Sequence, residues 1–211
     1  MYILIIYPMD IMSGMSMQRI KKLWPQKRWK KILLTTFLAL LIIAVSLLAY
    51  ASVGMNNDVI TELKIENSQG TKTALILYHP GLTSFSHDIA YAYADGLVSN
   101  NWRVEITTSS TQAPTDLSNY DLLVVLSNTY AFTPDKPTMR QLDRMGNLDG
   151  IQTVLITLGA GSAQESKTSL ESTVSASNGD IVQSLLLYSM AANEEEKAAT
   201  EIAIQAAQQI T

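Results

Sequence analysis

Runs of apolar residues alternate with amphipathic stretches from residue 73 to the end of the chain. The runs have the length of buried strands, and most of the stretches between them have the periodicity of helices. This alternation with short connections predicts an α/β three-layer sandwich on a five-stranded parallel sheet. The predicted strands are residues 73–78, 103–107, 121–127, 153–157 and 180–188, and the predicted helices are residues 86–99, 137–145, 163–174 and 194–210.

Three loops follow strands of this predicted sheet, and ligands of such folds bind beyond the carboxyl ends of the strands. Residues 79–86 offer hydroxyls and a helix N-terminus, which suit a phosphate, although N-capping by Ser86 explains the same pattern. Residues 127–137 carry two aromatic side chains, which suit either a flat ligand or a cover for the sheet edge. Residues 158–165 contain two glycines, Gly159 and Gly161, which allow close approach of a backbone to a ligand or satisfy a tight turn.

A long apolar stretch precedes the domain: residues 32–51 contain no charge, Pro or Gly. As a helix this stretch spans about 30 Å, the thickness of the hydrocarbon core of a bilayer. Seven basic residues lie within residues 19–31, and no Lys or Arg follows the stretch until Lys64. The asymmetry predicts a single-pass protein of the cell membrane, with a cytoplasmic N-terminus and an extracytoplasmic domain.

The chain is therefore divided into a basic tail, a membrane helix, a polar stalk with a short strand at 59–65, and the α/β domain. Their predicted bounds are 1–31, 32–51, 52–72 and 73–211. A cleaved signal peptide is the alternative, since Ala49-Tyr50-Ala51 is an A-x-A motif, but the length of the apolar stretch favours a retained anchor. The Met-rich start also leaves open that translation begins at Met12, Met15 or Met17.

The amino-acid composition excludes several kinds of functional site. The chain has no Cys and two His, which excludes thiol catalysis and disulfides and gives no basis for a metal site. The net charge of −4 combines +6 in residues 1–31, −1 in residues 52–72 and −9 in residues 73–211. The basic cluster belongs to the membrane flank, so no nucleic-acid partner is predicted. No catalytic residue is assigned, and Gln164 stands where a dinucleotide fingerprint requires Gly or Ala.

Three segments of the domain resemble the flavodoxin family. Residues 75–90 are similar to its first strand, phosphate loop and first helix, residues 120–130 to its third strand and flavin-flanking loop, and residues 148–161 to its fourth strand and second flavin loop. The resemblance covers nearly all of residues 73–211. It implies the strand order 2-1-3-4-5 and a site for flavin mononucleotide (FMN).

The resemblance also implies which residues surround the flavin. By position, the FMN phosphate would be bound by Thr83, Ser84, Phe85 and Ser86. The isoalloxazine ring would be lined by Asn128, Thr129, Tyr130 and Ala131, with Tyr130 as the stacking ring. The pyrimidine edge of that ring would lie along the backbone of Gly159, Ala160 and Gly161.

The implied activity is FMN-dependent electron transfer or an oxidoreductase reaction, with the lipid bilayer and a redox protein as partners. One departure from the family favours an alternative. Ser84 and Phe85 stand where the family's Thr-Gly-Asn-Thr loop has Gly-Asn. This departure and the exported location favour a degenerate flavodoxin fold that serves as a cofactor-free binding or scaffold module.

Overall fold

A computed structural model of the chain describes residues 27–193 and 197–211, and these fall into two compact units that divide between residues 50 and 51. The helix α2 (Arg28–Asn56) is 29 residues long and begins in the first unit. It is long and apolar enough to cross a membrane. The helix continues past the predicted end at residue 51. The basic residues before Lys27 lie outside the described residues.

The second unit contains a seven-stranded sheet in which five parallel strands follow the order β3-β2-β4-β6-β7. Numbered along the chain, these five have the order 2-1-3-4-5, as predicted. Two short antiparallel strands were not predicted as part of the sheet, β1 on the edge of β3 and β5 on β4. The strands are β1 (Lys64–Glu66), β2 (Lys72–Tyr78), β3 (Trp102–Thr108), β4 (Leu122–Tyr130), β5 (Thr133–Pro134), β6 (Gln152–Gly159) and β7 (Asp180–Tyr188).

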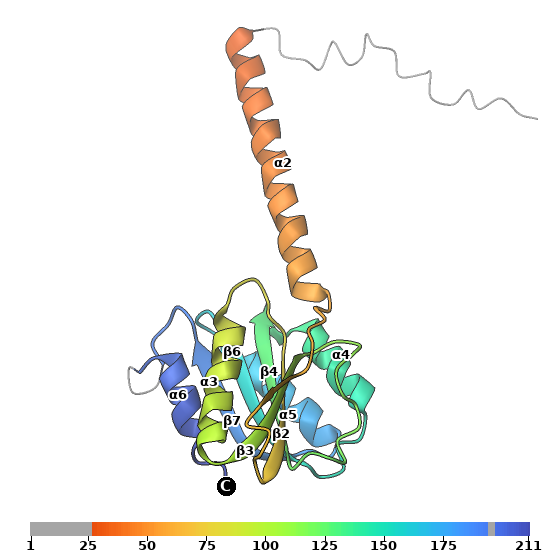
Figure 1. The fold of residues 1–211 in the computed structure, drawn as a ribbon. Coiled ribbons are helices and arrows are strands. Elements are labelled where there is room, and N and C mark those ends of the chain that lie inside the picture. Colours follow the sequence, from red (N-terminus) through yellow and green to blue (C-terminus); the bar gives the residue numbers. More distant parts are fainter. Residues whose placement is uncertain (1–26, 194–196) are drawn as a thin grey trace, which may run out of the picture. The chain divides into compact units, whose positions relative to one another are not determined.

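Helices cover both faces of this sheet, which gives three layers (Figure 1). Alternate residues of β2 and β4 enter separate cores, as the period of two along a strand requires. One core packs against α3 (Phe85–Ser99) and α6 (Ala199–Ala207), and the other packs against α4 (Lys136–Met145) and α5 (Gln164–Ala176).

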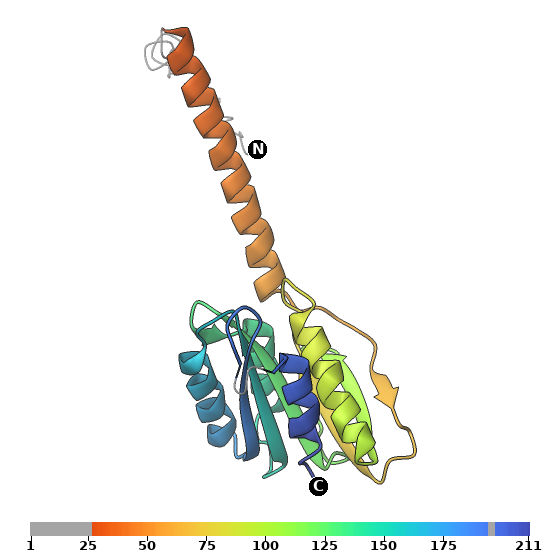
Figure 2. The same cartoon turned by 90° about the vertical axis from the view of Figure 1, so that its left-hand side faces the viewer.

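The helices α3 and α6 lie side by side on their face of the sheet (Figure 2). Gly96 allows this close approach, because a Cβ atom there would lie 2.5 Å from the carbonyl oxygen of Ile204 and 2.6 Å from Cβ of Ala207. The small residues Ala203 and Ala207 of α6 are fully buried in the same core. The Ala-rich composition of the last helix is thus explained by packing.

Within the sheet domain, the predicted boundaries of the third parallel strand and of the last helix differ most from the structure. The strand β4 runs on to Tyr130, so residues 128–130 of the predicted loop are strand, paired with β6 and with β5. The last helix begins at Ala199, because Ala198 has an extended backbone (ψ 141°). The residues Glu194–Glu196, which were expected to open it, lie outside the described residues.

The segment between α2 and β2 packs on the sheet domain. Thr61 exchanges hydrogen bonds with Thr108 at the end of β3, with its amide 3.2 Å from Thr108 Oγ1. Arg140 of α4 donates to the Asn56 carbonyl at 2.7 Å and pairs with Asp58. Residues 54–61 are therefore held by side chains at the carboxyl ends of the strands.

Candidate functional site

A shallow pocket of about 200 Å³ lies at the carboxyl ends of β2, β4 and β6. Residues from all three predicted loops line it. From the predicted set these are Thr83, Phe85, Asn128, Thr129, Tyr130, Gly159 and Ala160. The structure thus brings seven of the eleven predicted residues together, while Ser84, Ser86, Ala131 and Gly161 are not part of the lining.

The first loop is fixed against the end of β4. Gly81 has φ +69°, and a Cβ atom there would lie 2.7 Å from the Tyr130 hydroxyl and 3.1 Å from Nδ2 of Asn128. Asn128 Nδ2 donates to the His79 carbonyl at 2.7 Å. Glycine is required at position 81 by both its backbone conformation and the proximity of these side chains.

Some of the predicted phosphate-binding groups already form hydrogen bonds within the protein, and others are left to bind a ligand. Ser84 Oγ donates to Asp88 Oδ2 at 2.8 Å, and Ser86 Oγ donates to the His79 carbonyl at 2.5 Å. Both serine hydroxyls therefore serve the protein itself. The amides of Ser86 and His87 lie in the first turn of α3, where N–H groups have no intrahelical acceptor. The available anion donors are these amides and the hydroxyl of Thr83.

Tyr130 and Thr129 form the wall of the pocket at the end of β4. The half-buried Tyr130 hydroxyl is hydrogen-bonded to the Leu82 amide, and burial raises the pKa of the Tyr130 phenol. The buried Thr129 Oγ1 has no hydrogen-bond partner among the described residues. A polar atom orphaned in a pocket fits a ligand that carries hydrogen-bonding groups.

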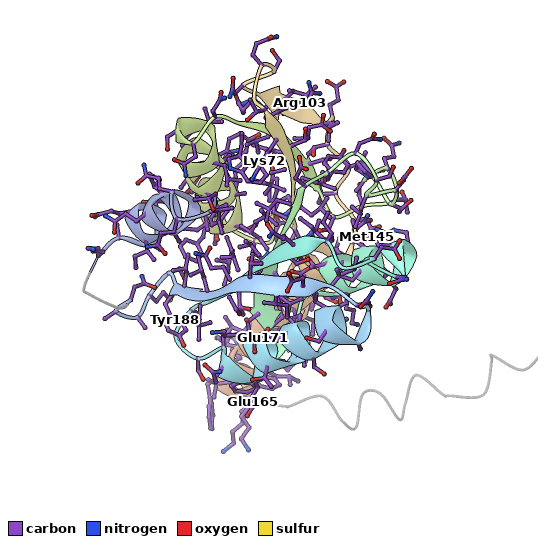
Figure 3. All side chains as sticks on the ribbon, turned by 90° about the horizontal axis from the view of Figure 1, so that it is seen from below. Lys72, Arg103, Met145, Glu165, Glu171 and Tyr188 are labelled. Carbon is purple, nitrogen blue, oxygen red and sulfur yellow. The ribbon has the colours of Figure 1, made fainter. Side chains whose placement is uncertain are left out.

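The third loop is tied to a fourth loop that the sequence did not indicate. The Gly159 carbonyl accepts from the Ser189 amide at 2.9 Å, and the Ala160 carbonyl accepts from the Met190 amide at 3.2 Å. Ser189 and Met190 therefore line the pocket beside Gly159. These residues directly follow Tyr188, the last residue of β7, which is labelled in Figure 3.

A buried polar network lies beneath the pocket and was also missed. Asp135 caps α4 by accepting from the Thr138 amide at 2.9 Å, and it accepts from the Asn128 amide at 2.7 Å and Ser127 Oγ at 3.1 Å. Burial raises the pKa of the Asp135 carboxyl, and the nearby His79 opposes that rise. The signal in the sequence was Asp135 two residues before Pro137, a typical helix start.

A larger hollow of about 660 Å³ lies at the opposite end of the sheet, where the strands begin. Figure 3, seen from below Figure 1, labels Met145 of its lining. Its three aspartates all accept hydrogen bonds within the protein: Asp121 Oδ2 from the Thr73 amide at 2.8 Å, Asp116 Oδ1 from the Ser118 amide at 2.9 Å and Asp149 Oδ1 from Asn147 Nδ2 at 2.6 Å. Because these acids serve the fold itself, we assign the candidate site to the smaller pocket.

Comparison with solved structures identifies the fold as flavodoxin-like. A flavodoxin from the domain Archaea is 16% identical with a TM-score of 0.53, and the match covers 65% of this chain and 95% of that one. Flavodoxin 2 from Bacillus cereus is 17% identical with a TM-score of 0.54, over 65% of this chain and 95% of its own. Megasphaera elsdenii flavodoxin is 13% identical with a TM-score of 0.54, over 64% and 98%.

No protein-family model matches this sequence, and no curated protein matches it either. At these identities the structural likeness establishes the fold alone. The flavodoxin-like fold expected from residues 73–211 is therefore confirmed, and the ligand has to be argued from the pocket.

Proposed function

We propose that the chain is a single-pass membrane protein whose flavodoxin-like domain binds FMN and transfers electrons outside the cytoplasm. The observation that carries the proposal is the convergence of three loops, distant in sequence, on one pocket at the carboxyl ends of β2, β4 and β6. This edge is the place at which ligands bind in open parallel sheets.

The residues available in the pocket fit the two ends of FMN. The Thr83 hydroxyl in the pocket lining suits the phosphate, and so do the amides of the first turn of α3, which lies beside the pocket. The unpaired Thr129 hydroxyl suits the polar edge of the ring system, and Tyr130 supplies a flat side chain beside it. FMN, when bound, supplies the one- and two-electron redox chemistry. The protein then contributes orientation and exclusion of water.

The anchor and its orientation belong to the same proposal. The apolar helix α2 supports the span, and the basic residues before it support a cytoplasmic N-terminus. The acidic residues of the domain suit a basic redox protein as the partner.

A second candidate, a cofactor-free binding or scaffold module, is favoured by a specific observation. Two predicted phosphate hydroxyls, Ser84 and Ser86, are already engaged by the protein. In addition, the pocket of about 200 Å³ is smaller than most ligand sites, which enclose roughly 300–1,000 Å³.

Flavin titration of the full chain in detergent micelles separates the two candidates. FMN binding predicts quenched flavin fluorescence, and riboflavin should bind more weakly because it lacks the phosphate that α3 would hold. Absence of quenching with FMN would refute the flavin proposal and leave the cofactor-free module.

Orientation is tested in intact cells with a single introduced cysteine, since the natural chain has none. Asn119→Cys, exposed on the domain, should react with a membrane-impermeant maleimide before lysis. Reaction only after lysis would contradict the proposed orientation.

A further inference from the structure

Three exposed apolar side chains lie on loops at the carboxyl ends of the strands, two of them in the lining of the candidate site, and we propose that the three form a membrane-contacting rim. The rim consists of Leu82, Phe132 and Met190, whose side chains would enter the interfacial layer of the bilayer in which α2 is anchored. The inference rests on the membrane anchor of the proposed function. It is independent of whether the pocket binds FMN.

Exposure and position define the rim. Leu82 is 44% exposed, Phe132 is 58% exposed and Met190 is 87% exposed. Leu82 and Met190 line the same pocket, and Phe132 lies two residues beyond its wall residue Tyr130. Grouped apolar side chains on a surface mark a contact with a partner or a membrane.

The loops that carry the rim contain no charged residue. Asp, Glu, Lys and Arg are absent from residues 73–87, 122–134, 150–164 and 181–193, although the domain as a whole is strongly acidic. Charged groups resist transfer from water to an apolar layer much more strongly than uncharged groups do. The charge pattern thus favours lipid over a charged protein as the occupant.

The backbone holds Phe132 in a conformation that disfavours it. Ala131 has φ +49° and Phe132 has φ +67° in the turn between β4 and β5. Such a conformation costs about 1–2 kcal/mol for a residue with a side chain. All other non-glycine residues with positive φ in the described chain are Asn or Asp, which tolerate it, namely Asn67, Asn101, Asp149 and Asn178. A strained aromatic residue directed to solvent indicates a functional contact.

The attachment of the chain selects the bilayer as the occupant. Within the second unit, His79 Nε2 donates to the Gly54 carbonyl at 3.1 Å, and a Cβ atom on Gly54 would lie 2.6 Å from the Leu82 side chain. The predicted membrane span ends at Ala51, three residues before Gly54. Three helical residues rise about 4.5 Å, which is within the thickness of the interfacial layer.

The test places one fluorophore at the rim and one at the opposite end of the sheet. Met190→Cys and, as the matched control, Asn119→Cys are labelled with bimane in the otherwise cysteine-free full chain and reconstituted in phosphatidylcholine vesicles. A nitroxide carried near the lipid headgroup should quench the label at 190 severalfold more than the label at 119. Aqueous iodide should give the reverse order.

Equal quenching of the two labels by the lipid nitroxide would overturn the rim. Flotation of the vesicles after carbonate extraction reports the anchor separately. Chain that fails to float contradicts the proposed anchor, and chain that floats without selective quenching contradicts the rim alone.

A second set of variants tests the side chains themselves. Phe132→Ser in the labelled Met190→Cys chain should lower the lipid quenching, and Phe132→Leu should restore it. Near-ultraviolet circular dichroism verifies that each variant is folded. Unchanged quenching in a folded Phe132→Ser chain would contradict a role for Phe132. Labelled Phe132→Cys repeats the depth measurement if the label at 190 disturbs the fold.

Discussion

The two ends of the parallel sheet have different turn chemistry. At the end where strands begin, left-handed backbone positions before β3, β6 and β7 are occupied by Asn101, Asp149 and Asn178. At the carboxyl end, the same conformation is imposed on Ala131 and Phe132. The first end uses residues suited to their turns, whereas the second, beside the well-suited Gly81, retains two residues that are unsuited to theirs.

The two ends also differ in how their aspartates are used. Asp121 is exposed and accepts one amide, whereas Asp135 is buried and joins three donors beneath the pocket. The larger hollow lies at the first end and the uncharged, strained loops lie at the second. Strain and buried polar pairing, rather than cavity volume, therefore place our candidate site at the second end.

The largest expected effect comes from the two aspartates. Asp135→Ala removes the acceptor of three hydrogen bonds, one of which caps α4, so it should lower the free energy of unfolding by about 3 kcal/mol. Asp121→Ala at the other end should cost about 0.5–1 kcal/mol, because water replaces the exposed carboxylate. Thermal unfolding of the full chain in micelles measures both. Equal losses would remove this difference between the two ends.

The second largest effect that we expect is a pH dependence of stability that comes from Asp135. Burial raises the pKa of the Asp135 carboxyl in the folded state. The stabilisation of the fold by the protonated carboxyl is therefore fully present below the unfolded-state pKa and is lost as the pH rises through the folded-state pKa. The stability of the natural chain relative to Asp135→Asn should therefore increase as pH is lowered from neutral towards about 3.9. Each unit of pKa shift corresponds to about 1.4 kcal/mol. Urea unfolding of both chains across this range measures the difference, and a flat difference would contradict the shift.

Much of the fold follows from the pattern of apolar positions. The five parallel strands could be predicted because the sequence contains long apolar runs. These runs exist because alternate residues of strands such as β2 and β4 enter two separate cores, so both faces of the strand are buried. The convergence of Thr83, Tyr130 and Gly159 follows from the same pattern, since parallel strands end at one edge.

The parts that were missed depend on pairing between distant residues. The contact of Asn128 with His79 spans 49 positions, and the contribution of Met190 arises from hydrogen bonds across to Ala160. Neither has a local signature. The turn at Ala131 and Phe132 was unpredictable for the opposite reason, because its residue types contradict its backbone.

The strained turn at Ala131 and Phe132 gives a further test of the difference between the two ends of the sheet. Phe132→Gly should raise the free energy of unfolding by about 0.5 kcal/mol, because relief of the left-handed strain outweighs the added freedom of the unfolded chain. Asn178→Gly at the other end should change it little, since Asn already suits its φ of +61°. Chemical denaturation of both variants measures the effect. A loss of stability in Phe132→Gly would show that the turn at the carboxyl end is not strained.

The smallest expected effect concerns charge at the start of α3. Asp88 accepts from Ser84 Oγ and places a carboxylate in the turn that would hold the FMN phosphate. Asp88→Asn removes that repulsion and should tighten FMN binding about twofold, as expected for one exposed charge at a helix N-terminus. Asp149→Asn makes the same charge change at the other end of the sheet and should leave the affinity unchanged. Fluorescence titration at low and high salt measures both, and the gain should shrink at high salt because the repulsion is screened. An equal gain in both variants would attribute the effect to net charge and would contradict phosphate binding at α3.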